Sequence, residues 1–354
     1  MGDGYSSPVV EDNRIYIFTR RGDREFISCL SVDNGRTLWQ DSYSAPYRMN
    51  PAAVSHGKGP KSTPVLHNGM LFTLGISGIL SGYDAPTGKL RWRKDFAAQF
   101  PETWPLYGAA MSPVVENGLL IAHVGGHDRG ALTAFDAHTG KVEWSWNGDG
   151  PGYASPIVVE LGGVRQVVTQ TQKYVVGVSA ADGKLLWRVG FTTAYDQNIV
   201  TPVAFQQTII YSGFAEGTTA IKALPRGENW ETEEIWHNTD VSMYMNSPVL
   251  SGGLLFGLSH RQKGQFFCLD ARTGSTLWAS PGRQAENAAM LSLGDSLLVL
   301  TNDAELMVVN KSAKGLEVIR RYSVADSPTW AHPVVLGNQI LIKDSTTLAL
   351  WSLE

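Results

Sequence analysis

The amino-acid sequence predicts an all-β protein, an eight-bladed β-propeller of four-stranded antiparallel blades whose last blade is incomplete. Two observations carry this prediction. Apolar strands opened by Ser-Pro or Thr-Pro recur along the 354 residues, and most repeats end in a turn with Asp and Gly followed by a strand with Trp. A repeat of about 40 to 50 residues with about four β segments is typical of a propeller.

The strand openings divide the chain into eight repeats. The expected blades begin near residues 7, 63, 112, 155, 201, 247, 288 and 332. The seventh opening, Ala288-Ala289, is degenerate, and the eighth is His332-Pro333. Because closed β architectures often form one long domain, we expect a single domain over residues 1–354.

The ends of the repeats share a turn whose residues have separate physical roles. Asp caps the turn with its side chain, and Gly adopts a positive φ. Trp in the following strand then offers a large flat surface for packing between neighbouring blades. The complete copies run from Asp33 to Trp39, Asp84 to Trp92, Asp136 to Trp144, Asp182 to Trp187 and Asp270 to Trp278. Repeat five keeps only Trp236.

This phrase resembles the tryptophan-docking motif of quinoprotein-type propellers, the PQQ-like repeat family. The resemblance covers essentially the whole chain. The family includes eight-bladed quinoprotein alcohol dehydrogenases and the propeller lipoprotein of the outer-membrane assembly machinery. The resemblance implies the propeller fold but leaves the activity open, because the motif packs blades together and touches no substrate.

The last repeat contains three expected strands, near residues 333–336, 339–343 and 347–353. Residues 1–4 are too few to supply an outermost strand, so we expect either that upstream sequence has been removed or that this blade has three strands. Residues 1–4 also lack the basic and apolar segments of a secretory signal. We expect that such a signal has been removed, and the resemblance then implies a periplasmic or extracellular location.

Composition narrows the possible partners. The net charge is -4 and the sequence has no block of Lys or Arg, which argues against nucleic acid as a partner. No stretch of about 18 apolar residues is present, so we expect no membrane span. Cys29 and Cys268 occupy equivalent third-strand positions in repeats one and six, so we expect them to be buried and unpaired. The oligomeric state is left open.

Meander topology separates the loops into two faces. One face carries short turns, and the other carries the second-to-third loops and the blade connections, where aromatic, amide and charged residues gather. Such a surface is typical of a binding funnel. The candidate binding residues are Lys61, Tyr107, His123, His127, Asp128, Arg129, Tyr195, Gln197, Asn198, Tyr244, Asn246, His260, Arg261, Asn287, Trp330, His332, Lys343 and Asp344.

Two side-chain groups within this set suggest specific chemistry. His123, His127 and Asp128 have a spacing that could hold a metal. We favour a glycine-rich loop in which the histidines donate hydrogen bonds, because no second cluster of ligands follows in sequence, and we expect no metal site. Arg261, next to His260, could bind an anionic group through both arms of its guanidinium, although a solvated loop is the simpler interpretation.

The residues favour binding over catalysis. Quinoprotein dehydrogenases have an adjacent pair of cysteines and a set of calcium-binding acids, and this chain has no adjacent cysteines, so we expect neither PQQ nor Ca²⁺ as a cofactor. We predict a non-catalytic extracytoplasmic binding or scaffold propeller, whose partner is a small polar ligand, a glycan or another protein. The alternative is an enzyme acting on a carbohydrate or another small polar substrate in the funnel. A PQQ-dependent dehydrogenase is the least favoured hypothesis.

Overall fold

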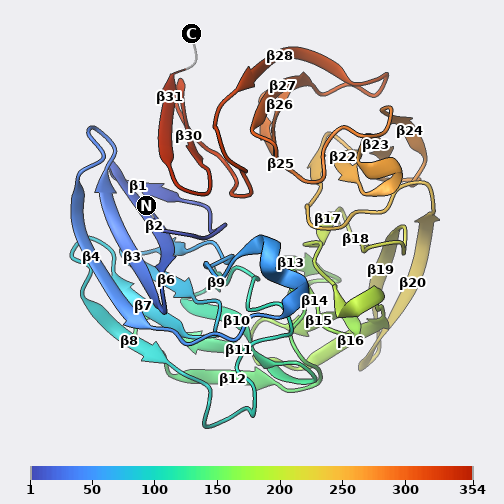
Figure 1. Ribbon diagram of the computed structural model, residues 1–354. Coiled ribbons are helices and arrows are strands. Elements are labelled where there is room, and N and C mark those ends of the chain that lie inside the picture. The colour runs from blue at the N-terminus through green and yellow to red at the C-terminus, as the bar shows by residue number, and fades with distance from the viewer. Residues whose placement is uncertain (1, 353–354) are drawn as a thin grey trace. The chain divides into compact units, whose positions relative to one another are not determined.

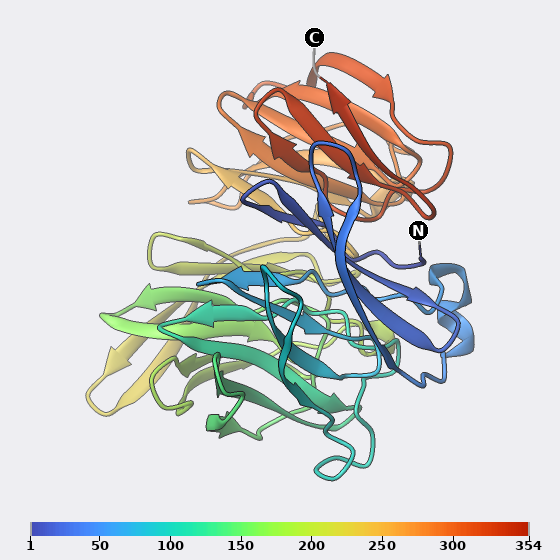
Figure 2. The same ribbon diagram turned by 90° about the vertical axis from the view of Figure 1, so that its left-hand side faces the viewer.

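A computed structural model describes residues 2–352 as eight antiparallel sheets in chain order. Seven sheets have four strands and the last has three. Each is built from strands that follow one another in sequence, so each has a nearly uniform colour in Figures 1 and 2. The sheets fall into two compact units, which we describe separately: unit 1 contains residues up to 151 and from 331 onward, and unit 2 contains residues 152–330.

Unit 1 contains the first three blades and the last. Blade 1 consists of β1 (Val9–Glu11), β2 (Arg14–Arg21), β3 (Arg24–Ser31) and β4 (Thr37–Ser44). After the short 3-10 helix η1 (Pro51–His56), blade 2 consists of β5 (Val65–His67), β6 (Met70–Leu74), β7 (Leu80–Asp84) and β8 (Leu90–Lys94). Blade 3 consists of β9 (Val114–Glu116), β10 (Leu119–Gly126), β11 (Arg129–Asp136) and β12 (Val142–Trp146). Blade 8 consists of β29 (Val334–Leu336), β30 (Gln339–Lys343) and β31 (Leu348–Ser352).

Unit 2 contains blades 4 to 7. Blade 4 consists of β13 (Ile157–Leu161), β14 (Val164–Gln170), β15 (Tyr174–Ser179) and β16 (Leu185–Gly190), and is followed by η2 (Ala194–Asp196). Blade 5 consists of β17 (Val203–Phe205), β18 (Thr208–Ser212), β19 (Thr218–Arg226) and β20 (Asn229–Asn238). Blade 6 consists of β21 (Val249–Ser251), β22 (Leu254–Ser259), η3 (Arg261–Lys263), β23 (Gln265–Asp270) and β24 (Thr276–Ala279). Blade 7 consists of β25 (Ala288–Leu293), β26 (Ser296–Thr301), β27 (Glu305–Asn310) and β28 (Glu317–Ser323).

The predicted strand openings and the short last blade are confirmed. The degenerate opening at Ala288 begins β25, the first strand of a complete four-stranded blade. At the other end of the chain, Asp3 forms a single antiparallel bridge with Arg20 of β2, so the first described residues lie against blade 1. Blade 8 has the three strands that the sequence predicts.

The repeated Trp residues make a repeated contact with the following blade. The indole N–H of Trp39 donates to the carbonyl of Ala85 at 2.9 Å, and that of Trp92 donates to the carbonyl of Ala137 at 3.0 Å. In unit 2, Trp236 makes the same bond to Ala271 at 3.1 Å. A Cβ atom on Gly88 would lie 2.4 Å from the ring of Trp39, so the turn needs glycine at this position.

One buried carboxylate links blades 1 and 2. Glu25 in β3 is fully buried, and its Oε2 accepts a hydrogen bond from the Tyr43 hydroxyl at 2.7 Å. Its Oε1 accepts a hydrogen bond from the backbone N–H of Ile76 at 2.8 Å. Gly75 leaves room for this carboxylate, because a Cβ atom there would lie 2.1 Å from Oε2. The carboxylate therefore satisfies two buried donors at the junction of the blades.

We expect Glu25→Gln to become more stable relative to the wild type as the pH rises from about 4 to about 7. Burial raises the pKa of Glu25 in the folded protein. A raised folded-state pKa contributes stability below the unfolded value, and that stability is lost as the pH rises through the folded value. Chemical denaturation at several pH values measures this difference in the free energy of unfolding.

Asp84→Asn is the matched control and should show the opposite trend. Hydrogen bonds from Thr87 and Arg91 lower the pKa of Asp84, so its contribution is present above the ordinary Asp pKa and is lost in acid. The same pH dependence for both variants would contradict the role assigned to Glu25.

Candidate functional site

In unit 2, loops from blades 4, 5 and 6 bring together aromatic and polar side chains that are far apart in sequence. The Tyr244 hydroxyl donates to Oε1 of Gln197 at 2.7 Å. The ring of Phe214 lies 4.9 Å from that of Tyr244 and 4.2 Å from that of His260 between centroids, and it is stacked on the latter. We call this group, with Tyr195 and Arg261, the blade 4–6 surface.

His260 is positioned by three contacts. Its ring stacks on Phe214, its Nε2 accepts a hydrogen bond from the backbone N–H of Ala215 at 3.1 Å, and its own backbone N–H donates to the carbonyl of Ser242. Burial lowers the pKa of His260, and the positive charge of Arg261 lowers it further. The imidazole is therefore neutral at pH 7, and Arg261 carries the positive charge of this segment.

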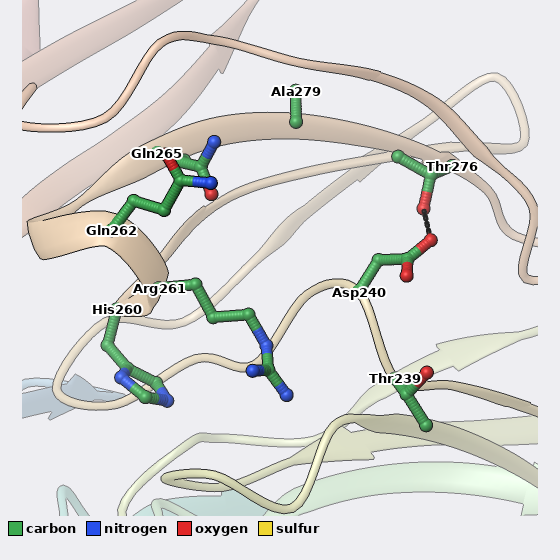
Figure 3. A pocket seen from close by; sticks show the side chains of 8 residues that line it. All are labelled: Thr239, Asp240, His260, Arg261, Gln262, Gln265, Thr276 and Ala279. Atoms are coloured by element: carbon green, nitrogen blue, oxygen red, sulfur yellow. Dashed lines mark hydrogen bonds between the residues drawn. The ribbon is translucent and has the colours of Figure 1, made fainter.

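A pocket of about 690 Å³ opens beside His260 and Arg261 (Figure 3). Its lining comes from the end of blade 5, the η3 loop and the outer strands of blade 6. The lining residues are Thr239, Asp240, His260, Arg261, Gln262, Gln265, Thr276 and Ala279. Seven of these eight side chains are polar or charged, so the pocket suits a ligand with several hydrogen-bonding groups.

The two charged groups of the pocket have different surroundings. Asp240 Oδ2 accepts a hydrogen bond from the Thr276 hydroxyl at 3.3 Å, the one interaction drawn in Figure 3. Arg261 Nε is buried without a hydrogen-bond partner among the described residues. In Figure 3 the guanidinium points toward the side of the pocket formed by Thr239 and Asp240. Arg261 Nε is therefore a buried donor of the pocket that lacks an acceptor among the described residues.

The η3 loop is held in one conformation by the chain that leaves blade 6. Arg283 N–H donates to the carbonyl of Gln262, and Gln284 N–H donates to that of Gly264. Gln262 and Lys263 adopt positive φ angles of 50° and 64°, which are uncommon outside glycine and are maintained only where the surroundings enforce them. Gly264 has no room for a side chain, because a Cβ atom would lie 1.9 Å from the carbonyl of Ala285.

Other predicted residues in unit 2 have different surroundings. Tyr195 lies in η2 with 75% of its surface exposed and a φ of 64°, so its side chain is accessible. Asn198 is fully buried, and its side-chain amide donates to the carbonyls of Thr171, Gln172 and Phe191. Asn246 and Asn287 are also buried, and Trp330 lies in the connection after blade 7. Unlike Tyr195, the three asparagines have no exposed side chain to offer a partner.

In unit 1, two predicted lysines bind backbone carbonyls. Lys61 Nζ donates to the carbonyl of Tyr107 at 2.9 Å, and burial lowers its pKa to about 8. Lys343 is the last residue of β30 rather than a loop residue, and it is 2% exposed. Its Nζ donates to the carbonyls of Gly4 and Asp344. The exposed His332 follows the Trp330-Ala331 connection, and its backbone N–H donates to the Ser7 hydroxyl.

The prediction that His123 lies in a loop is wrong. His123 lies inside β10, is buried, and donates a hydrogen bond from Nε2 to the carbonyl of Asp149 at 3.1 Å. Burial lowers its pKa to about 4. Gly125 and Gly126 continue the strand, so the turn contains only His127 and Asp128, and Arg129 already begins β11. The glycine-rich segment is therefore part of the ladder and not of a loop.

His127 and Asp128 do lie together at this turn, where His127 Nε2 is 3.5 Å from Asp128 Oδ2. His123 does not join them, because it faces Asp149 inside the blade. Within residues 2–352, no group of three or more His, Cys, Asp or Glu side chains is arranged to hold a metal.

Several residues of the blade 4–6 surface and of the pocket beside it are not among the predicted residues. Phe214 sits in the second-to-third loop of blade 5, and an aromatic residue between Gly213 and Ala215 was the available signal. Asp240 and Thr276 gave no comparable signal, because they belong to a blade connection and to an outer strand. Their meeting depends on the packing of blade 5 against blade 6.

Comparison with known proteins identifies the family. The PQQ_2 family model, described as outer membrane protein assembly factor BamB, matches residues 23–280. The chain belongs to this family. BamB of Shewanella oneidensis is 22% identical over 83% of this chain and 75% of that protein. BamB of Yersinia pestis is 21% identical over 97% of this chain and 83% of that protein.

Dehydrogenases of the quinoprotein type are also similar. The quinohemoprotein alcohol dehydrogenase ADH-IIG of Pseudomonas putida is 30% identical over 146 residues, which are 39% of this chain. That match spans 19% of the dehydrogenase, so most of its length has no counterpart in the alignment.

Solved structures support the fold. BamB of Moraxella catarrhalis superposes with a TM-score of 0.69 and 14% identity, over 99% of this chain and 94% of that protein. The prediction of an all-β, eight-bladed propeller is confirmed. No helix among the described residues is long and apolar enough to cross a membrane.

Substitutions in the pocket should lower the free energy of unfolding much less than a substitution of a Trp that packs between blades. We expect Arg261→Ala to change the free energy of unfolding by about 0.5 kcal/mol or less, because its guanidinium bonds to no described residue. His260→Ala should cost about 1 kcal/mol through its lost ring contact. Trp187→Ala should cost about 3 to 5 kcal/mol, because the buried Trp187 fills space over Gly177 and donates to Gln166.

Denaturant unfolding of the three variants measures these differences. If Arg261→Ala were as destabilising as Trp187→Ala, Arg261 would be a structural residue and not part of a binding site.

Proposed function

We propose that this chain is a non-catalytic, extracytoplasmic scaffold propeller that binds a partner protein through the blade 4–6 surface. The family supports this role, because its model and two long relatives are named as an outer membrane protein assembly factor. The relatives' names also support a location outside the cytoplasm.

The observation that carries the proposal is the continuous contact from Gln197 through Tyr244 and Phe214 to His260, beside the unpartnered Arg261. Tyr and Arg are enriched among the residues that dominate binding energy in protein interfaces. These side chains are already positioned by their mutual contacts, so a partner need not order them on binding.

The composition of the pocket favours binding over carbohydrate cleavage. Glycoside hydrolysis usually requires two carboxyl groups on either side of the bond, and Asp240 is the one carboxylate in the pocket lining. His260 is poorly placed as a general base, because its Nε2 already accepts a hydrogen bond from Ala215. These groups can orient a ligand, and they do not form an acid–base pair.

The residues present do not fit PQQ, the cofactor implied by the quinoprotein relatives. Cys29 and Cys268 are both buried and free, in the third strands of blades 1 and 6. Cys29 packs among Tyr16, Phe18 and Ile27, and Cys268 packs in a separate apolar cluster. They cannot form the adjacent pair that the family's dehydrogenases use. We propose that the protein functions without PQQ or Ca²⁺.

We also propose that the Trp residues act as the docking residues that the sequence motif implies. Four indole N–H groups, those of Trp39, Trp92, Trp236 and Trp278, donate to backbone carbonyls 34 to 46 positions further along the chain. These contacts support a role in holding adjacent blades together.

A photo-crosslinking residue at Tyr195 should capture a partner protein in the periplasm of a Gram-negative host. Tyr195 is exposed on the proposed surface, and Arg272 is an exposed control in the turn at the other end of β23. We expect one defined adduct from position 195, containing an outer-membrane assembly protein, and none from position 272. Binding of the purified partner would then be measured. Equal labelling from both positions, or no adduct from position 195, would contradict the proposal.

Addition of PQQ and Ca²⁺ to the purified protein should produce neither quinone absorbance after gel filtration nor dye-linked oxidation of alcohols. The physical reason is that the two cysteines are separate and buried. Retention of one PQQ per chain would show that the cofactor proposal is wrong.

A further inference from the structure

We propose that the pocket beside Arg261 binds a carboxylate group carried by a peptide, with the Arg261 guanidinium as the anchor. This inference rests on the proposed function and names the chemistry by which the blade 4–6 surface would recognise its partner. The carboxylate belongs either to the C-terminus of a peptide or to an Asp or Glu side chain.

Arg261 supplies the reason for an anionic ligand. Arg261 lines the pocket, and its Nε is buried without a hydrogen-bond partner among the described residues. A buried N–H without an acceptor is unfavourable, and the planar fork of the guanidinium matches the two oxygens of a carboxylate. Asp240 lies in the same pocket, and its Oδ2 accepts a hydrogen bond from the Thr276 hydroxyl.

Asp240 supplies the reason for a peptide rather than a free inorganic anion. A carboxylate near the guanidinium repels a second negative charge, and more strongly a dianion such as phosphate. A peptide presents N–H donors within a few atoms of its carboxylate, and Asp240 can accept from them. The amides of Gln262 and Gln265 and the Thr239 hydroxyl add further hydrogen-bonding groups to the lining of the pocket.

The site is built before the ligand arrives. Gln265 is held by a hydrogen bond from Nε2 to the carbonyl of Ser280 at 2.8 Å, and Arg261 N–H donates to the Ser259 hydroxyl at 3.3 Å. The positive φ angles of Gln262 and Lys263 are enforced by the bonds from Arg283 and Gln284. A loop fixed in this way loses little conformational entropy on binding, which favours recognition of a small chemical group.

The neighbouring ring limits what the pocket can accept. His260 is neutral, stacked on Phe214 and bonded to Ala215, so it adds an apolar face without a second positive charge. One fixed cation and one fixed carboxylate give the pocket no net charge. The pocket is therefore suited to a single carboxylate beside polar groups, and not to a polyanion.

The experiment uses the full chain and four probes in calorimetric titrations. The probes are an acetylated tripeptide with a free α-carboxylate, the same tripeptide as its C-terminal amide, an amidated tripeptide with a central Glu, and inorganic phosphate. We expect one or both carboxylate peptides to bind at least about tenfold more tightly than the amide and phosphate, the difference of one charge-assisted hydrogen bond. The comparison of the two carboxylate peptides identifies the source of the group.

Variants of the chain test the role of the guanidinium. Arg261→Ala should weaken binding of the carboxylate peptide about tenfold to a hundredfold. Arg261→Lys should bind the peptide with an affinity between those of Arg261→Ala and the wild type, because a lysine lacks the planar fork. Arg272→Ala is the matched control, since Arg272 lies at the opposite end of β23 in an exposed turn, and it should bind as the wild type does. Asp240→Asn removes the negative charge of the pocket, so it should reduce the difference in affinity between the carboxylate peptide and inorganic phosphate.

Equal binding of the amide and the carboxylate peptides, tighter binding of phosphate, absence of binding by any probe, or unchanged binding by Arg261→Ala would each overturn this inference. The crosslinking at position 195 is independent of these titrations. A partner captured there without carboxylate selectivity would refute the pocket chemistry alone, and loss of both would refute the proposed function as well.

Discussion

At four blade junctions, a Trp indole binds the backbone of the following repeat. The ring of Trp39 covers Gly88, and its N–H is satisfied by the carbonyl of Ala85 in the same turn. The apolar indole ring is thus buried together with its N–H donor, and the donor can be buried because a backbone carbonyl accepts its hydrogen bond. The same arrangement joins Trp92 to Gly140 and Ala137, and Trp236 to Gly274 and Ala271.

Blades 4 and 5 pack through an apolar cluster that includes Trp187, Ile209 and Tyr211, and Trp236 of blade 5 bonds to Ala271 of blade 6. Gln197, Phe214, Tyr244 and His260 lie in loops of blades 4 to 6, and they meet because these blades pack against one another. A binding surface built in this way inherits the rigidity of the sheets below it. The unusual backbone angles of the η3 loop are compatible with that rigidity, because the connection after blade 6 holds the loop in place.

Several charged and polar residues at strand ends and in connections serve the fold instead. Arg20 is 1% exposed and donates to the carbonyls of Gly22 and Ala45, and Glu25 ties blade 1 to blade 2. Lys343 and Asn198 likewise bind carbonyls that would otherwise be buried without partners. In a protein built almost entirely of strands and tight connections, irregular backbone needs such side chains, so polarity in a loop does not by itself mark a site.

The sequence by itself determined the fold class, the eight repeats, the short last blade and the positions of the Asp–Gly turns, because these depend on local turn chemistry and on a spacing that recurs along the chain. It also pointed to His260 and Arg261 through their place in a second-to-third loop. Only the tertiary structure decided that Asp240 and Thr276 complete their pocket, that Phe214 joins them to Tyr244, and that His123 is buried in a strand. Those facts depend on which side chains of different blades come into contact and on where a strand ends, and neither is encoded in the spacing of a repeat.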